Sequence, residues 1–223
     1  MSRKRPGKQE YKKIKHLTTP EDIKALLPYA HPLSWYKPGR LITVNNKMQQ
    51  NSYRYMLSAK PGKSFAAGFK PQLSPAKMLE MGVFEGKYLN DCIFEFPREW
   101  YKKALRANKL SPNAPNIMVN EFKIKSRLSL RKWKQNGWIP ITNGDNDDRG
   151  WFQWYCRYWI GRRDVNVDAI QIARWRTFTR HKGQILASYV RLGPKKPKTR
   201  AQKRLHRPRQ RQALLQWAYR PYA

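Results

Sequence analysis

Hydrophobic residues recur with a helical period in several short segments of this chain, and Pro, Gly and Asn separate these segments. A first helix is predicted over residues 20–27, where Ile23 and Leu26 fall on one face. Thr19 suits its N-cap and Pro20 its first position. The sequence therefore predicts a short amphipathic helix near the start of the chain.

The next part of the chain has a weaker pattern. Residues 29–73 predict loops with one short strand at 41–44. A second helix is predicted to start at Ser74 and Pro75 and to end at Gly82, because these residue types are common at helix boundaries.

Two more helices and a strand are predicted in the centre. Pro97 opens one helix that runs to about Asn108. Ser129 caps another, which ends at residues 136–137. Residues 119–125 alternate weakly between apolar and polar side chains and predict a strand between these helices.

The most unusual segment is residues 150–163, in which six of fourteen residues are aromatic. We predict a helix that starts at Asp147 or Asp148 as N-cap and stops at Gly161. A helix that is aromatic on all sides is usually buried, so the rings are expected to form core. The alternative is that at least one Trp stacks on a base. If the rings form core, three basic side chains are expected to point outward: Arg157, Arg162 and Arg163.

Residues 166–190 predict the longest helix, with Asn166 or Asp168 as its N-cap. Four residues are expected to face the core: Ile170, Ala173, Phe178 and Ile185. The helix also carries a basic set beside Trp175: Arg174, Arg176, Arg180, His181 and Lys182. Such a helix either lies along a phosphate backbone or presents a solvated face.

The charge of the chain indicates what kind of partner the protein binds. The chain has 223 residues with 47 Lys and Arg against 14 Asp and Glu, which gives a net charge of +33. A polyanion must neutralise such an excess, and nucleic acid is the commonest polyanion. With 40% hydrophobic and 13% aromatic residues the chain is too apolar for a wholly disordered basic protein.

The basic residues divide the chain into four predicted regions. Residues 1–16 form a basic arm and residues 17–72 an N-terminal helix with an irregular segment. Residues 73–190 form a Trp-rich helical domain, and residues 191–223 a basic tail that ends in a short apolar helix or hook. Without a partner, the segment of this tail at residues 193–212 is expected to be disordered. It is predicted to contact nucleic acid, with an acidic protein or a targeting signal as the alternatives.

We predict that the arms and the basic helix neutralise phosphates. The candidate nucleic-acid-binding residues are Arg3, Lys4, Arg5, Lys12, Lys13, Arg157, Arg162, Arg163, Arg174, Arg176, Arg180, Lys195, Lys196, Lys198, Arg200, Lys203, Arg204, Arg207, Arg209 and Arg211.

The sequence contains few residues in patterns that would indicate metal binding or catalysis. Zinc ligands could come only from residues without the usual close spacing: Cys92, Cys156, His181 and His206. A carboxylate site would have to use Glu95, Glu99, Asp145, Asp147 or Asp148, with His181 as a general base. Glu95 and Glu99 are four residues apart and could share a helix face. Charge relief and capping are the preferred roles for these acids, so we expect no catalytic residue, metal or cofactor.

Five blocks of the sequence resemble an uncharacterised protein family with members in several lineages, including large DNA viruses. The blocks are LSPAKMLEMGVFEGKYLNDC (73–92), LSLRKWKQNGWI (128–139), DRGWFQWYCRYWIGRR (148–163), IARWRTFTRHKGQI (172–185) and HRPRQRQALLQWAY (206–219). The resemblance implies a single domain over about residues 73–219. It implies no activity, and no functional residues are carried over. A family of this spread fits a mobile or enzymatic role as well as a structural one.

Together these features predict a mainly α fold with short β strands and basic extensions at both ends. The first hypothesis for function is a structural RNA-binding component of a large ribonucleoprotein such as a ribosome, with other proteins as neighbours. A DNA-binding or virion genome-associated protein is the alternative, and an enzyme acting on nucleic acid is the third. Two cysteines, no transmembrane run and no secretory signal predict a reducing compartment. The cytoplasm, an organelle, the nucleus and a virion remain open.

Overall fold

A computed structural model describes residues 4–48, 53–126, 130–135 and 147–222. These residues confirm the predicted fold class, because they form a mainly helical structure with one small antiparallel sheet. The helices are α1 (Lys8–Lys13), α2 (Pro20–Leu26), α3 (Pro75–Glu80), α4 (Arg98–Arg106), α5 (Leu130–Gln135), α6 (Trp151–Ile160), α7 (Val165–Thr177), α8 (Thr179–Leu192), α9 (Arg200–Leu205) and α10 (Pro208–Gln216). The strands are β1 (Leu41–Thr43) and β2 (Arg54–Met56).

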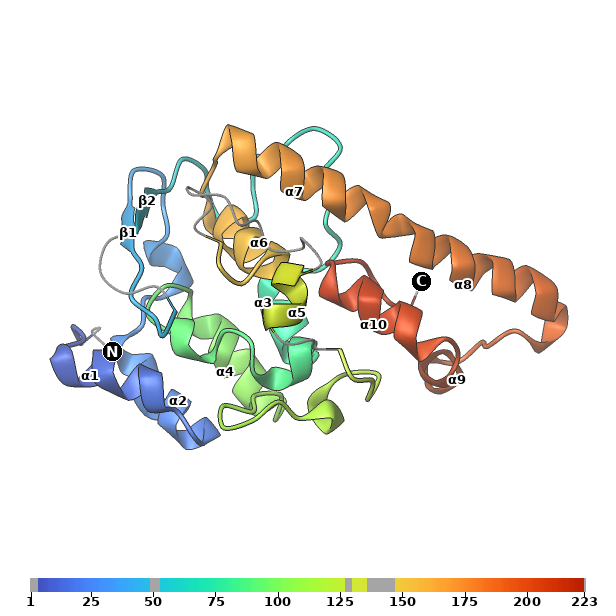
Figure 1. Cartoon of the computed structure of the whole chain (residues 1–223), viewed down its shortest axis with the longest axis horizontal. Coiled ribbons are helices and arrows are strands. Elements are labelled where there is room, and N and C mark those ends of the chain that lie inside the picture. Colours follow the sequence, from blue (N-terminus) through green and yellow to red (C-terminus); the bar gives the residue numbers. More distant parts are fainter. Residues whose placement is uncertain (1–3, 49–52, 127–129, 136–146, 223) are drawn as a thin grey trace.

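Helix α6 lies in the middle of the molecule, and the other elements pack around it (Figure 1). Helix α3 contacts both α4 and α6, and α7 contacts α6. Helices α7 and α8 form a long rod along one edge, with α10 packed against α8 (Figure 1). Helices α1 and α2 and the sheet lie at the opposite end of the molecule from α8 and α9 (Figure 1).

The first predicted helix is α2 and the first predicted strand is β1, and both form where the sequence places them. The Thr19 side chain accepts a hydrogen bond from the backbone N–H of Asp22, and Pro20 is the first residue of α2. Strand β1 pairs with β2 so that Ile42 faces Tyr55, and both side chains point into the core. The strand neighbours of these two residues are exposed, which is the alternation expected of a sheet with one buried face.

Helices α3, α4 and α5 also lie where the sequence predicts helices, although Ser129 and residues 136–137 lie outside the described part. The strand predicted over residues 119–125 is wrong. Residues Ile117–Val119 form a turn of 3-10 helix, and the chain then continues without strand pairing. The side chain of Asn116 accepts a hydrogen bond from the N–H of Met118, which favours the turn over an extended strand.

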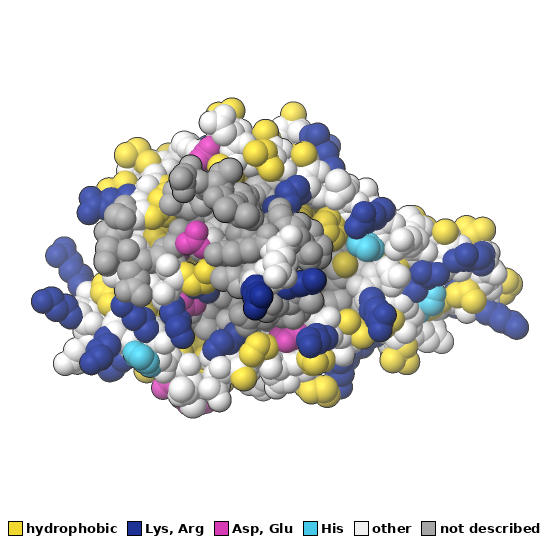
Figure 2. Space-filling view, in the orientation of Figure 1, with side chains coloured by type: hydrophobic (Ala, Val, Ile, Leu, Met, Phe, Trp, Pro, Cys, Tyr) yellow, Lys and Arg dark blue, Asp and Glu magenta, His cyan; other side chains and the backbone are white. Residues whose placement is uncertain are grey.

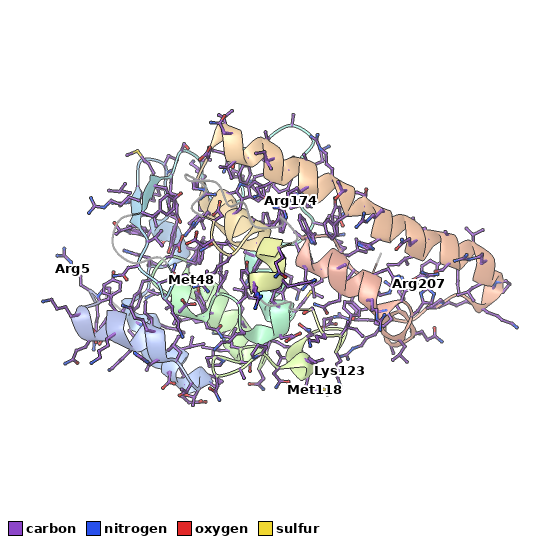
Figure 3. All side chains as sticks on the ribbon, viewed as in Figure 1. Arg5, Met48, Met118, Lys123, Arg174 and Arg207 are labelled. Carbon is purple, nitrogen blue, oxygen red and sulfur yellow. The ribbon has the colours of Figure 1, made fainter. Side chains whose placement is uncertain are left out.

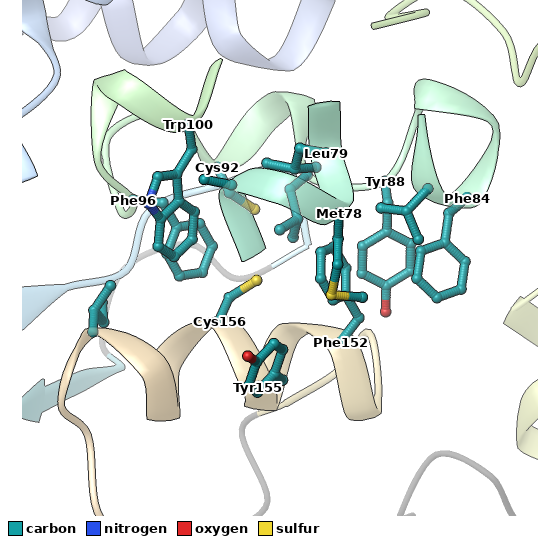
Figure 4. Packing of buried hydrophobic residues seen from close by; sticks show 14 of the residues in the cluster. Met78, Leu79, Phe84, Tyr88, Cys92, Phe96, Trp100, Phe152, Tyr155 and Cys156 are labelled. Atoms are coloured by element: carbon teal, nitrogen blue, oxygen red, sulfur yellow. The ribbon is translucent and has the colours of Figure 1, made fainter. Parts of the chain in front are cut away.

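Helix α6 is buried almost all round, which confirms the prediction that its rings form core. Figure 4 shows Phe152 and Cys156 pointing from α6 towards Met78, Tyr88 and Cys92 on the opposite segments. Gly161 ends the helix in a left-handed conformation, as predicted. The predicted N-cap is wrong, because the cap position is occupied by Gly150, which has no side chain to accept a hydrogen bond. Asp147 is instead buried beside arginines, and Asp148 is half-buried.

The single helix predicted over residues 166–190 is two helices, α7 and α8, which meet at Phe178. The hydroxyls of Thr177 and Thr179 donate to backbone carbonyls one turn earlier, which favours a break at this point. The N-cap is Asp164, in place of Asn166 or Asp168.

The predicted core face of this region is only partly correct. Ile185 is buried and Phe178 is half-buried, but Ile170 and Ala173 are exposed. Four other side chains take the inward positions on α7: Asp168, Gln171, Ile172 and Trp175. The break at Phe178 changes which side chains face inward before and after it.

The two ends of the chain are more structured than predicted. In the N-terminal arm, Ile14 is buried and the ring of Tyr11 packs against Phe94 with a centroid distance of 5.1 Å. The C-terminal tail forms α9 and α10, and α10 packs on α8. Arg211 of α10 has no exposed surface. The prediction of a disordered tail is therefore wrong, because apolar residues after residue 212 anchor the basic segment to the core.

Candidate nucleic-acid interface

Two of the arginines predicted to point outward lie inside the protein. The Arg157 Nε lies 2.6 Å from Glu95 Oε1, and its NH1 lies 3.0 Å from Asp147 Oδ1. Arg162 forms a short ion pair with the other oxygen of Asp147. Burial alone would lower the pKa of Arg157, but Glu95 and Asp147 raise it above its ordinary value. Arg157 and Arg162 are therefore structural cations, and their prediction as phosphate ligands is wrong.

A second buried pair lies next to this cluster. The guanidinium of Arg149 binds both carboxylate oxygens of Asp91, at 2.9 and 2.6 Å, and donates to the carbonyl of Tyr88. Together with the first cluster, three arginines meet three carboxylates. This pairing offsets the cost of burying the charges, and it leaves Glu95 and Asp147 buried and Asp91 half-buried.

The remaining acids contribute little negative charge to the surface. Within the described part of the chain, Glu21 is the one acidic residue that is exposed rather than buried or half-buried. Glu121 is typical of the half-buried acids. Burial would raise its pKa, but hydrogen bonds from Tyr222 and Arg200 lower it, so its charge is matched locally.

The basic side chains have the opposite distribution. Lys and Arg side chains stand out at both ends of the face in Figure 2, where carboxylates are few. Figure 3 places Arg5 near α1 at one end and Arg207 beside α9 and α10 at the other. The solvent-facing surface is therefore far more basic than the interior.

Most of the predicted phosphate ligands do lie on this surface. The exposed ones are Lys4, Arg5, Lys12, Lys13, Arg176, Arg180, Lys195, Lys196, Lys198, Arg200 and Arg209. The half-buried ones are Arg163, Arg174, Lys203, Arg204 and Arg207. Arg211 is buried like Arg157 and Arg162, because its guanidinium bonds Tyr189 and the carbonyls of His206 and Pro221. Arg3 lies outside the described residues.

A pocket of about 460 Å³ opens beside this basic surface. It lies between the start of α6, the junction of α7 and α8, and the end of α10. Five aromatic side chains line it: Phe84, Trp151, Phe152, Phe178 and Trp217. Their rings bring apolar surface and flat faces to one cavity, which is the usual composition of a small-ligand pocket.

The rings at the pocket belong to a continuous row. Phe178 stacks on Trp217 with a centroid distance of 3.8 Å and an interplanar angle of 14°. Trp217 lies 4.7 Å from Trp151, which in turn stacks on Tyr155 at 5.0 Å. The row runs from the buried centre of α6 to the half-buried Phe178. One end of the aromatic core therefore reaches the basic surface.

Two arginines lie beside the aromatic lining. The guanidinium carbon of Arg174 lies 5.9 Å from the centroid of Trp217, and that of Arg180 lies 5.8 Å from Phe178. Figure 3 marks Arg174 beside α7. Arg174 also donates to Gln171 Oε1 at 3.2 Å. Aromatic faces next to guanidinium groups are able to hold a flat ring that carries negative charge.

Sequence reasoning predicted Arg174 and Arg180 but missed the pocket itself. Phe84, Trp151, Phe178 and Trp217 are far apart in the sequence, and the structure brings them together. The one local signal was the isolated Trp217 in the apolar end of the tail. No spacing rule connects it with Phe84.

A strained turn supports the pocket wall. Phe84 and Glu85 have left-handed backbone conformations, with φ values of 54° and 61°. The Glu85 N–H donates to Asn120 Oδ1 at 2.9 Å, and Glu85 Oε1 accepts from the Ser126 N–H at 2.8 Å. Such conformations cost about 1–3 kcal/mol each and persist only where the surroundings hold them. Here they fix Phe84 in the pocket.

The candidate catalytic residues within the described part of the chain do not form a comparable site. Glu95 precedes α4 and is ion-paired, and Glu99 lies in α4 and accepts from the Leu33 N–H, so the two share no helix face. Asp145 lies outside the described residues. His181 contacts Gln184, and burial together with Arg180 lowers its pKa. The carboxylates of Glu95 and Asp147 are therefore held in ion pairs with arginines.

The described residues hold neither a metal-binding cluster nor a membrane-spanning helix. No three of their His, Cys, Asp and Glu side chains are arranged to hold a metal ion, and Cys92 and Cys156 lie in the core. Within the same residues, no helix has the length and apolar character that crossing a membrane requires.

The chain matches no protein-family model, no curated protein and no solved structure. The family resemblance therefore stays a prediction.

Proposed function

We propose that this protein binds nucleic acid, and that its partner is RNA in a large ribonucleoprotein. The observation that carries the proposal is the sorting of charge between interior and surface. Acidic residues are buried or half-buried in the described structure apart from Glu21, whereas most of the described Lys and Arg are exposed, from Lys4 near one end to Arg220 near the other. A surface of this kind attracts a polyanion along most of its extent.

The mechanism is neutralisation of phosphates with release of counterions. Each phosphate that a Lys or Arg neutralises releases a condensed cation, so the affinity falls steeply with salt. Basic side chains stand on several short elements, including α1 and α9, rather than on one protruding helix. This arrangement favours the irregular phosphate positions of folded RNA over a regular duplex groove.

Exposed apolar side chains on α8 and α9 favour contacts with neighbouring proteins in the particle. Leu186 and Val190 of α8 are 45% and 82% exposed, and Leu205 of α9 is 82% exposed. Exposed apolar groups beside a basic surface suit a partner that is itself seated on the nucleic acid.

The proposal is tested by anisotropy of the full chain with labelled single-stranded RNA, structured RNA and duplex DNA over a salt series. We expect the tightest binding to structured RNA and a strongly negative slope of log affinity against log salt. Native isolation before and after RNase supplies the second readout, with collapse of a large particle expected. Tighter binding to DNA, with a particle sensitive only to DNase, would support the DNA-binding alternative. Absence of binding at low salt would contradict both.

A further inference from the structure

We propose that the aromatic pocket holds one extruded base of the bound RNA while Arg174 and Arg180 hold the phosphates beside it. The inference rests on the proposed function and names its ligand: a nucleobase that carries a phosphate. A free nucleotide has the same chemistry as a nucleotide within an RNA chain, and the experiment below distinguishes these two sources of the base. The structure assigns the pocket to a base of a chain, because the charges around it belong to a surface that extends well beyond one nucleotide.

The shape and lining of the cavity suit a flat ring. Its volume of about 460 Å³ falls within the range of about 300–1,000 Å³ that is usual for small-ligand pockets. The stacked pair of Phe178 and Trp217 forms one side, and Phe84 and Phe152 belong to the same lining. Stacking on such rings tolerates any base, since every base has a π-face.

The polar groups around the cavity suit a phosphorylated base. Of the described residues that line it, none is acidic, whereas Arg174 and Arg180 bring two cations. Thr177 and Gln216 add a hydroxyl and an amide to the same lining. Cations that lie beside aromatic rings can bind a phosphate while the rings stack on its base.

The pocket is also held open by the fold. The left-handed backbone at Phe84 places one wall, and the hydrogen bond from Ser126 to Glu85 fixes the next part of the lining. Another part of the lining depends on the end of α10, where the carbonyl of Trp217 accepts from Trp175 Nε1 at 2.9 Å. A preformed cavity binds a ring without first ordering the chain, which saves entropy.

The test uses the full chain and a short single-stranded RNA that carries one iodouridine. Ultraviolet crosslinking followed by peptide mapping locates the base, and anisotropy of the same RNA reports total binding. We expect crosslinks to peptides that contain Phe178 or Trp217. Crosslinks found only on other peptides would overturn the inference while leaving the proposed function intact. Absence of RNA binding altogether would overturn both.

Three variants sharpen the result. Thr177→Trp fills the pocket, so the crosslink should disappear and the affinity should fall about tenfold, with an unchanged salt slope because no phosphate contact is lost. Arg180→Gln should weaken the crosslink and lower the salt slope by about one. Arg191→Gln, at the other end of α8, is the matched control and should lower only the slope. Should Thr177→Trp fail to fold, Arg180→Gln still tests the proposal, since a crosslink as strong as that of Arg191→Gln would contradict the assignment.

The two sources of the base are separated by iodouridine monophosphate alone. We expect it to label the pocket weakly and to be displaced by unlabelled RNA. Efficient labelling by the free nucleotide that RNA does not compete away would contradict the assignment to an RNA base.

Discussion

Gly161 ends α6 with a φ of +119°, a conformation that residues with side chains rarely adopt. A Cβ at this position would lie 2.0 Å from the carbonyl oxygen of Ala59. We therefore expect Gly161→Ala to lower the free energy of unfolding by more than about 2 kcal/mol, measured by urea denaturation.

Gly183 is the matched control for this prediction. It lies inside α8, and an added Cβ would meet nothing within 4 Å. Gly183→Ala should raise stability by about 0.5–1 kcal/mol, because alanine is the better helix former. Equal effects of the two substitutions would contradict the backbone explanation.

The buried cluster around Arg157 gives the second prediction. Arg157→Gln leaves Glu95 and Asp147 without their shared cation, so stability should fall by about 3–5 kcal/mol in denaturant unfolding. Arg54 is an exposed arginine on β2, and Arg54→Gln should change stability by less than about 0.5 kcal/mol. A mild effect at Arg157 would mean that the cluster is not closed to water.

The two cysteines give a chemical prediction. Burial raises the pKa values of the Cys92 and Cys156 thiols, and both sulfur atoms lie in the core shown in Figure 4. Neither should be alkylated by iodoacetamide at neutral pH in the native protein, and both should react after unfolding. Mass spectrometry measures this directly. Rapid native alkylation at either site would show that the core around α6 opens.

At the scale of elements, α2 links stability to pH through its N-terminal cap. Backbone hydrogen bonds from Thr18 and Thr19 to the Asp22 carboxylate lower its pKa from 3.8 to about 2. The lowered pKa means that this stabilisation is complete above pH 3.8 and is lost as the pH falls through 2. Asp22→Ala should therefore cost about 1 kcal/mol at neutral pH, with the difference from wild type vanishing near pH 2.

Thermal or urea unfolding at several pH values checks this prediction. Glu21→Ala serves as its control, since Glu21 is the exposed neighbour in the same turn. A difference between Asp22→Ala and wild type that stays constant down to pH 2 would exclude the cap as its source.

Elements with local boundary signals could be predicted from the sequence. Thr19, Ser74 and Gly161 each mark a helix end through their own side chain or backbone, and each lies where expected. The break at Phe178 was missed although Thr177 and Thr179 are local signals for it, and the stacking of the Phe178 ring on Trp217 is a contact between distant segments that no local pattern shows. The strand predicted near Phe122 failed for a related reason, since its apolar residues pack on the core without a neighbouring strand.

At the scale of the whole molecule, composition predicted the basic surface but not which arginines belong to it. Arg157 and Arg162 look like phosphate ligands in sequence, and only the positions of Glu95 and Asp147 in space reveal them as buried. The pocket was equally hidden, because its walls come from segments far apart in the chain.

Two arginines in the first turn of α10 test this distinction between surface and interior charges. Arg209 is exposed, whereas Arg211 is buried and bonds Tyr189. Arg209→Gln should lower the salt slope of RNA binding by about one and leave stability unchanged. Arg211→Gln should lower stability and leave the slope of the folded fraction unchanged. The reverse result would contradict the assignment of surface and interior charges.

The row of rings from Tyr155 through Trp151 and Trp217 to Phe178 has an optical consequence. Chromophores held in fixed, asymmetric contact give near-ultraviolet circular dichroism that disappears when tertiary packing is lost. Because Trp217 follows α10 and Trp151 begins α6, their 4.7 Å contact records whether the last helix is docked on the centre of the molecule. The protein thus carries a built-in spectroscopic reporter for the closure of its own C-terminal segment.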